Sequence, residues 1–342
     1  MQLLVLVRHG STLARLLDQK YKVLAINKKN DTYQKCCGGL LSPDAQKILA
    51  KFDLCLPNHV LVNPQIFSVR TIDIPNQIEK FYQRFYLNMD RSKFDNFLMS
   101  LIPNHIDIFG DSTCKKIQKN HDSYSIEFEN NGKRIIKEAK IVIGSDGANS
   151  IVRNTFYQKH KIKKYVAIQE WYQNMNTSSF YSCIFDKKIT DSYSWTISKD
   201  DYFIIGGAFP IQDSNTRFDL LKETARKKGF LFEEKVKREG CFVYLNQGFK
   251  SICTGKNNAY LIGEAAGMIS PSSLEGISYA MESGSILAGL LNKNIDHLAC
   301  RYFLKTLKIR FRLSFKCFKK PFMYYKFFRN LVIRSGIGAI KK

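Results

Sequence analysis

Acidic side chains are scarce in this 342-residue sequence, which has 30 Asp and Glu against 53 Lys and Arg and a formal net charge of +23. Beyond residue 300 there are none. Such an excess of positive charge predicts anionic partners, for example a membrane surface or a phosphorylated substrate. We expect no nucleic-acid partner, because no nucleic-acid-binding motif accompanies the charge.

Metal-site and disulfide patterns are also missing. The nine cysteines include no C-x-x-C pair and no spacing with histidine that is typical of a metal site. We therefore expect no metal, and reduced thiols as in a cytoplasmic protein. No signal peptide is expected, and no apolar run is long enough to span a bilayer. The length predicts two domains, or one domain with a large insertion.

Glycine is missing where a dinucleotide-binding βαβ opening requires it. Residues 2–7 predict a first strand, and Gly10 begins a short helix before the next strand. In such units the first turn reads G-x-G-x-x-G, and an acid follows the second strand. Here Val5 and Val7 occupy the first two glycine positions, and Asn27 replaces the acid. Either this opening is disrupted, or the true start lies upstream, or the turn binds a dinucleotide poorly.

The stretch from Tyr260 to Gly284 provides what the opening lacks. An apolar run over 259–262 predicts a buried strand that ends on an acid, Glu264. Small and turn-forming residues surround this acid and lead to the start of a predicted helix, namely Gly263, Gly267, Pro271 and Gly276. A helix N-terminus favours a phosphate or an anionic ring, so the segment indicates a cofactor cradle.

A second acidic turn lies earlier in the chain. Residues 140–143 predict another apolar strand, followed by Gly144, Ser145, Asp146 and Gly147, and then by Ser150 and Arg153. Together the two segments resemble the FAD-dependent oxidoreductases of the aromatic hydroxylase and geranylgeranyl reductase superfamily. That family has G-x-D-G-x-x-S-x-x-R at the first acid and G-D-A-A-G at the second. Glu264 stands where the family usually has Asp, so the geometry there must shift.

The resemblance extends to further segments and implies site residues in them. Cys37-Gly38-Gly39 matches a C-G-G segment that lies near the flavin in geranylgeranyl reductases, and Arg91 matches an arginine that touches the cofactor. Tyr193 and Trp195 fall in a partial match to a motif that lines the lipid-substrate cavity. The implied cofactor contacts are Gly10, Ser11, Cys37, Gly38, Gly39, Arg91, Asp146, Gly147, Gly263, Glu264, Gly267, Pro271 and Gly276. No side chain is evident as a catalytic acid.

The expected fold is α/β: a Rossmann-like FAD-binding domain, an inserted antiparallel β-sheet substrate domain and a helical C-terminus. We assign residues 1–60, 90–158 and 250–295 to the FAD-binding domain and residues 61–89 and 159–249 to the substrate domain. Within the latter, Thr216 to Lys237 predicts a charged helix. In the former, Asn131-Gly132 predicts a β-hairpin turn.

Residues 296–342 form a basic, aromatic C-terminal region. Lysines and arginines alternate there with phenylalanines and tyrosines. One interpretation is an amphipathic surface that lies on an anionic membrane, so that the protein is cytoplasmic with a peripheral membrane contact. The favoured interpretation is a helical cap whose aromatic side chains pack on the protein and whose lysines face water.

The function implied by the resemblance is an FAD-dependent reductase that transfers a hydride from reduced flavin to a C=C bond of an apolar or isoprenoid substrate. NAD(P)H or a ferredoxin-like protein would supply the electrons. Two alternatives stay open. One is a flavin monooxygenase that hydroxylates an aromatic or polycyclic substrate, and the other is an inactive flavoprotein remnant, for which Val5, Val7 and Asn27 are the evidence.

Overall fold

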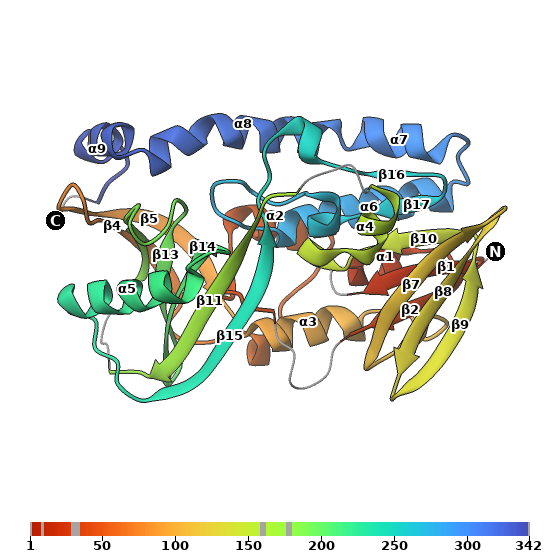
Figure 1. Cartoon of the computed structure of the whole chain (residues 1–342), viewed down its shortest axis with the longest axis horizontal. Helices are drawn as coiled ribbons and strands as arrows, with labels where there is room; N and C mark the ends of the chain where they lie inside the picture. The colour runs from red at the N-terminus through yellow and green to blue at the C-terminus, as the bar shows by residue number, and fades with distance from the viewer. Residues whose placement is uncertain (1, 8–9, 29–34, 158–161, 176–179, 341–342) are drawn as a thin grey trace. The chain divides into compact units, whose positions relative to one another are not determined.

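The structure, a computed structural model, describes residues 2–7, 10–28, 35–157, 162–175 and 180–340, with side chains from Gly10 onward. Contacts divide the chain into two compact units, each made of three separate segments (Figure 1). Unit 1 contains residues 1–34, 95–163 and 244–317. Unit 2 contains residues 35–94, 164–243 and 318–342.

Unit 1 is built on a six-stranded sheet in the order β16-β17-β10-β1-β2-β6. All neighbours pair in parallel except β16 and β17, as expected when helical crossovers connect the strands. The strands are β1 (Gln2–Val7), β2 (Lys22–Asn27), β6 (Asp107–Phe109), β10 (Ile141–Gly144), β16 (Gly255–Lys256) and β17 (Ala259–Leu261).

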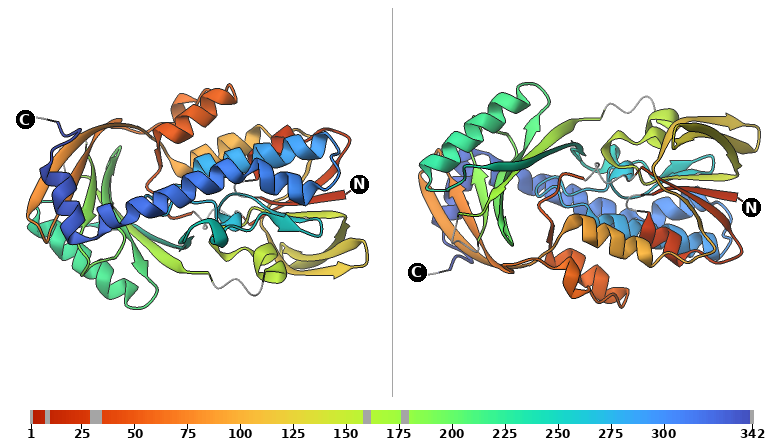
Figure 2. Two further views of the ribbon diagram at one scale, coloured as in Figure 1. Left: turned by 90° about the horizontal axis from the view of Figure 1, so that it is seen from above. Right: turned by 90° about the horizontal axis from the view of Figure 1, so that it is seen from below.

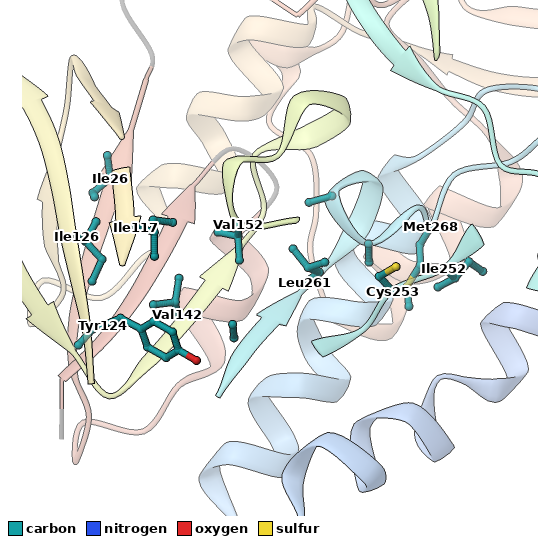
Figure 3. Close-up of a cluster of buried hydrophobic side chains, with 14 of the residues drawn as sticks. Ile26, Ile117, Tyr124, Ile126, Val142, Val152, Ile252, Cys253, Leu261 and Met268 are labelled. Atoms are coloured by element: carbon teal, nitrogen blue, oxygen red, sulfur yellow. The ribbon is translucent and has the colours of Figure 1, made fainter. Parts of the chain in front are cut away.

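Successive side chains of these strands point to opposite faces, and both faces are covered. Val23 and Ile143 pack with helices α1 (Ser11–Leu16), α6 (Ile277–Asn292) and α7 (Leu298–Lys305). Leu24 and Val142 pack instead against the antiparallel sheet β7 (Ser112–Asn120), β8 (Ser123–Asn130) and β9 (Lys133–Ala139). Figure 3 shows Val142 beside Tyr124 of this sheet. Figure 2 shows α6 and the three-stranded sheet on opposite sides of the parallel sheet. Burial on both faces explains the continuous apolar runs of these strands.

The predicted hairpin turn is present in the three-stranded sheet. Asn131 and Gly132 join β8 to β9 with φ angles of 47° and 75°. Two successive positive φ values are what a type I′ turn requires, and Asn-Gly adopts them at the least steric cost.

Unit 2 is built on an eight-stranded, mainly antiparallel sheet in the order β15-β11-β14-β13-β12-β4-β5-β3. Helix α5 (Ser214–Lys227) packs one apolar face on it through Phe218 and Leu221. Its strands are β3 (Leu40–Leu41), β4 (Ile66–Asp73), β5 (Ile78–Asn88), β11 (Lys164–Gln173), β12 (Tyr181–Phe185), β13 (Ser194–Lys199), β14 (Tyr202–Pro210) and β15 (Lys235–Tyr244). Its other helices are α2 (Pro43–Lys51) and α9 (Lys326–Arg334).

The predicted helix from Thr216 to Lys237 was wrong in its second half. The helix ends at Lys227, Gly229 adopts a φ of +84°, and the chain returns to the sheet as β15. Glycine is suited to this left-handed conformation just past a helix end, and it terminates the helix there. From Val236 to Phe242 exposed and partly buried residues alternate in the structure, as in a strand with one face toward solvent.

The compact units and the predicted domains divide the chain differently at several boundaries, most widely at residues 35–60 and in the C-terminal region. Residues 35–60, predicted within the FAD-binding domain, belong to unit 2, and residues 296–317 belong to unit 1 rather than to a separate region. Two helices begin in one unit and end in the other, namely α3 (Arg91–Ser100) and α8 (Leu307–Tyr324). No helix among the described residues is long and apolar enough to cross a membrane.

Candidate functional site

Two acidic turns lie at the carboxyl ends of neighbouring parallel strands in unit 1. Gly144, the last residue of β10, pairs with Leu261, the last residue of β17. Asp146 follows the first strand, and Glu264 lies in a one-turn 3-10 helix after the second. A β-carbon placed on Gly147 would lie 3.4 Å from Glu264 Oε2, so the two turns touch. Ligands of open α/β sheets bind at this edge.

Arg153 ties the two turns together. Ser150 caps helix α4 (Ile151–Phe156) by accepting a hydrogen bond from the Arg153 N–H at 3.1 Å. The buried guanidinium then donates to the carbonyl of Ala148 in the first turn and, at 2.7 Å, to that of Ala265 in the second. Ser150 and Arg153 of the motif thus join the two acidic turns by hydrogen bonds.

The two carboxylates have different environments. Asp146 Oδ2 accepts a hydrogen bond from the Ile151 N–H at 2.7 Å, whereas Oδ1 is buried without a hydrogen-bond partner in the part of the chain that the structure describes. Burial raises the pKa of Asp146. Glu264 is also buried, and its Oε1 accepts a hydrogen bond from the Tyr244 N–H at 3.0 Å. Asp146 Oδ1 therefore remains an acceptor that a hydroxyl group of a ligand would satisfy.

Gly263 and Gly267, on either side of the turn with Glu264, are required by the packing of neighbouring parts of the chain. Gly263 has a φ of +56°, and a β-carbon there would lie 2.9 Å from the β-carbon of Ala280 in α6. Gly267 has a φ of +82°, and its β-carbon would lie 2.7 Å from the Ser251 carbonyl oxygen. Glycine is therefore needed at both positions because the backbone closely approaches other parts of the chain, and the implied cofactor contacts of these residues stay a prediction.

Gly276 differs from these two. It precedes α6 with a φ of −128°, and a β-carbon there would meet only Ile269, at an ordinary 3.7 Å. Pro271 is buried in the loop before Gly276. In this loop the Ser270 hydroxyl accepts a hydrogen bond from the Ser273 N–H at 3.2 Å. No contact among the described residues requires glycine at position 276.

The turn between β1 and α1, where a dinucleotide-binding enzyme has its glycines, is described only in part. Gly10 and Ser11 begin α1, and both are buried. Asn27 ends β2 opposite Val7 of β1 and is buried. The side chains of Val5 and Val7 lie outside the described residues, so the prediction that they obstruct a dinucleotide stays a prediction.

Unit 2 brings together other predicted site residues. Arg91 at the start of α3 places Nη1 3.6 Å from Cys37 Sγ, and the Gly39 N–H donates to the same sulfur at 3.4 Å. Gly39 has a φ of +62°, and a β-carbon there would lie 2.4 Å from the Met89 carbonyl oxygen. A β-carbon on Gly38 would collide with the Ile197 side chain at 2.6 Å. The segment is therefore fixed against β13 and the end of β5.

Lys199 is the residue of this region that sequence reasoning missed. Its buried ammonium group donates to Asn88 Oδ1 at 2.6 Å, to the Met89 carbonyl at 2.7 Å and to the Gly39 carbonyl at 3.2 Å. Burial lowers the pKa of Lys199 to about 7. The available signal was a lysine at the end of a strand whose other residues are apolar or small, which predicts a buried cation with specific partners.

Tyr193 and Trp195 lie side by side, with ring centroids 5.8 Å apart. Trp195 pairs with Gly206 of β14, which pairs in turn with Gln169 of β11, so the three form a row across the sheet. Gly206 leaves room for the indole, because a β-carbon there would lie 2.7 Å from Trp195 Nε1. Trp195 Nε1 is buried and has no hydrogen-bond partner among the described residues.

No model of a known protein family matches the chain. Curated relatives do match: Protein CbrA of Escherichia coli K12 and Protein CbrA of Shigella sonnei are each 45% identical over 335 residues. In both cases the match covers 97% of this chain and 95% of the relative. The chain belongs to the CbrA family.

Solved structures show which fold the CbrA family has. A geranylgeranyl bacteriochlorophyll reductase-like protein from Thermoplasma acidophilum superposes with a TM-score of 0.78 at 18% identity, covering 99% of this chain and 88% of that one. The p-nitrophenol 4-monooxygenase PnpA from Pseudomonas putida gives 0.72 at 13% identity, covering 98% and 93%. PqsL from Pseudomonas aeruginosa, a probable FAD-dependent monooxygenase, gives 0.70 at 13%, covering 98% of each chain. The predicted fold is thereby confirmed.

In this CbrA-family chain the predicted site residues form two groups, one in each unit. Unit 1 holds the strand-end group with Asp146 and Glu264, and unit 2 holds the group with Cys37, Arg91 and Trp195. No group of three or more His, Cys, Asp and Glu side chains within the described ranges is placed to hold a metal ion.

Proposed function

We propose that this chain is an FAD-dependent oxidoreductase. The observation that carries the proposal is the pair of touching acidic turns at the ends of β10 and β17, with the buried acceptor Asp146 Oδ1. Cofactor hydroxyl groups are the natural partners of such an oxygen at this edge of an α/β sheet. The fold shared with a probable FAD-dependent monooxygenase supports the same cofactor.

The residues present fit FAD on two counts. Asp146 and Glu264 offer carboxylate oxygens for hydroxyl groups, and the start of α6 carries the partial positive charge that favours an anionic ring. Gly276 lies at the start of α6, where no close protein contact requires glycine, so the space beside it is open to a cofactor. When bound, FAD supplies the two-electron chemistry, and the protein supplies position and electrostatics.

The proposed reaction is the reduction of a C=C bond in an apolar or isoprenoid substrate, with NAD(P)H or a ferredoxin-like protein as electron donor. Support comes from unit 2, where Gly38 and Gly39 hold Cys37 beside Arg91. The adjacent rings of Tyr193 and Trp195 suit an apolar substrate. The reductase-like neighbour superposes better than the monooxygenases, with TM-scores of 0.78 against 0.72 and 0.70.

The first test is flavin retention. We expect the purified protein to keep near-stoichiometric FAD after incubation and desalting, as read from its visible absorption. Replacing Asp146 by Ala should weaken flavin affinity by roughly 10- to 100-fold, the range for a hydrogen bond to a charged group. The matched control is Glu129→Gln, which removes an exposed carboxylate that pairs with Lys115 Nζ at 2.9 Å. A folded protein that retains no flavin would favour the inactive remnant and contradict the proposal.

The second test separates reduction from oxygenation. With geranylgeranyl diphosphate as probe and dithionite as electron source, we expect anaerobic addition of two hydrogens to the probe, read by mass spectrometry. Oxygen uptake that is stoichiometric with hydroxylation of an aromatic substrate would instead support a monooxygenase. A protein that binds FAD but reduces no isoprenoid would leave the cofactor proposal standing and contradict the proposed substrate class.

A further inference from the structure

Helix α8 carries an exposed stripe of phenylalanines. Phe311, Phe315, Phe318 and Phe322 follow one another at intervals of four, three and four residues, which places them on one side of the helix. Their exposed fractions are 63%, 61%, 75% and 51%. The buried residues Ile309 and Leu313 lie on the other side. The favoured sequence interpretation, in which the aromatic residues pack on the protein, therefore does not account for most of this exposed surface, although Phe311 contacts the Phe249 ring with centroids 5.7 Å apart.

The exposed apolar surface continues beyond α8. Arg329 on the inner side of α9 is buried and forms a two-point ion pair with Asp73, with Nε to Oδ2 at 2.6 Å and Nη2 to Oδ1 at 2.9 Å. Near the chain end, the Ile340 N–H donates to the Phe81 carbonyl at 2.8 Å. These contacts hold α9 and the residues after it to unit 2. They leave apolar side chains exposed, namely Tyr325, Phe327, Phe328, Leu331, Val332 and Ile337.

The charge around this surface has one sign. Residues 301–342 contain no Asp or Glu. Lys308 precedes Phe311 by three residues and Lys319 follows Phe315 by four, so both exposed lysines border the stripe. Lys326 and Arg334 are exposed on α9. Apolar side chains bordered by cations match a bilayer interface with anionic headgroups, where apolar burial and electrostatic attraction add.

We propose that the exposed face of α8 and α9 docks on an anionic lipid bilayer, with the phenylalanines inserted among the acyl chains and the lysines at the phosphate level. A second copy of the chain is a poor occupant, because two such faces would bring like charges together. Nucleic acid would pair with the lysines but leave the phenylalanine stripe in water. The inference does not depend on the proposed enzyme activity.

The experiment is co-sedimentation of the full chain with vesicles. We expect binding to vesicles of 30% phosphatidylglycerol in phosphatidylcholine, weak binding to pure phosphatidylcholine, and a marked decrease between 50 and 500 mM salt. The double variant Phe315→Ser/Phe318→Ser should lower the partition constant about 100-fold, roughly tenfold for each ring withdrawn from the bilayer. Lys308→Gln/Lys319→Gln should lower it about 30-fold on anionic vesicles only.

The control variant is Phe67→Ser, which removes a phenylalanine of similar exposure, 63%, from strand β4 in unit 2. Vesicle binding should be unchanged in it, and circular dichroism should show all variants folded. Equal binding of the double phenylalanine variant and the wild type would overturn the proposal, as would an absence of vesicle binding. So would a dimer in solution that the phenylalanine variants dissociate, or RNA binding that they leave intact.

Discussion

Lys199 shows how a single residue fixes the conformation of a distant segment. Its ammonium group reaches oxygen atoms of Gly39, Asn88 and Met89, which come from two other parts of the chain. Without the lysine, the buried Asn88 Oδ1 would lose its donor at a cost of about 1–3 kcal/mol, whereas the Gly39 carbonyl oxygen also accepts the Met89 N–H at 2.9 Å. The lysine thereby helps to hold Gly39, two residues after Cys37, in its left-handed conformation. We regard it as a positioning residue.

We predict a pH dependence of stability that belongs to this lysine. Its folded pKa of about 7 lies below the ordinary value of 10.5, so between these values the unfolded chain binds the additional proton. The free energy of unfolding therefore gains a contribution that rises with pH in this window, at most about 1.4 kcal/mol per unit, and falls toward pH 7. Urea unfolding at pH 7.5 and 9.5 should show a smaller rise in Lys199→Met than in the wild type.

The control for this pH effect is Lys305→Met, which removes an exposed lysine on α7. It should keep the wild-type dependence. If Lys199→Met and the wild type gain the same stability between the two pH values, the ammonium is retained in the folded state and the lowered pKa is contradicted.

A second prediction at this scale concerns Gly276. Its φ of −128° and its 3.7 Å contact with Ile269 allow an alanine, so Gly276→Ala should change the free energy of unfolding by less than about 0.5 kcal/mol. Under the proposed function the added methyl group would occupy cofactor space, and we expect flavin affinity to fall at least tenfold. Fluorescence titration with FAD measures it.

Gly289→Ala is the matched control within the same helix, because nothing lies within 4 Å of its added β-carbon. It should bind flavin like the wild type. Equal affinities of the two variants would show that the start of α6 does not contact the cofactor.

What the sequence predicted at the residue scale depended on local motifs. Asp146, Ser150 and Arg153 lie within eight residues of one another, so a pattern in the chain could identify them. Lys199 could not be found in this way, because its acceptors are more than 100 residues away along the chain. The contact between Gly267 and Ser251 also lies outside the local motif, and it shows a packing reason for glycine there, while the predicted cofactor contact of Gly267 stays a prediction.

At the scale of elements, the S-x-x-R motif joins the turn after β10 to the turn after β17. Helix α4 has only six residues, yet its Ser150 cap and its Arg153 side chain connect the carboxyl ends of β10 and β17. Tyr244 adds a ring contact 5.1 Å from the guanidinium carbon. This buried positive charge is retained because Nη1 and Nη2 both donate to carbonyl oxygens, whereas Nε has no hydrogen-bond partner among the described residues.

Replacing Arg153 by Met should therefore uncouple the acidic turns. Two buried carbonyl oxygens, of Ala148 and Ala265, lose their donor, and we expect a loss of about 2–4 kcal/mol in the free energy of unfolding. Flavin affinity should fall as well, because Asp146 and Glu264 lose their fixed separation. Denaturant unfolding and FAD titration give the two values.

Arg134→Met provides the comparison, since Arg134 forms an exposed ion pair with Glu127 on the three-stranded sheet. Its loss should cost less than about 1 kcal/mol. If Arg153→Met is destabilised but binds FAD with wild-type affinity, Arg153 serves stability alone and the proposed role of the two turns is weakened.

Local signals also decided which elements were predicted correctly. The Asn131-Gly132 hairpin and the buried strands of unit 1 follow from turn chemistry and apolar runs. The helix predicted from Thr216 to Lys237 is present as far as Lys227, and its second half was wrong because charged residues suit an exposed helix and an edge strand equally well. β15 lies at the edge of its sheet, where one side of the strand has no partner strand and charged residues are tolerated.

For the whole molecule, the path of the chain predicts coupled unfolding. The segments alternate between the units, and helices α3 and α8 each begin in one unit and end in the other. Adjacent turns of a helix share i→i−4 hydrogen bonds, so unwinding the part of a helix in one unit removes bonds that stabilise its next turn in the other unit. Loss of structure in unit 1 should therefore destabilise unit 2, although each unit has a core of its own.

The two tryptophans make this coupling measurable, because Trp171 and Trp195 both belong to unit 2. FAD at 100 times its dissociation constant should add about 2.7 kcal/mol to the free energy of unfolding. Under the proposed function the strand-end residues of unit 1 contribute to FAD binding. If the units unfold together, the denaturant midpoints measured by tryptophan fluorescence and by circular dichroism should nevertheless shift by the same amount. Two separate midpoints, with the fluorescence transition unmoved by FAD, would mean that the shared helices do not transmit stability and that each unit unfolds alone.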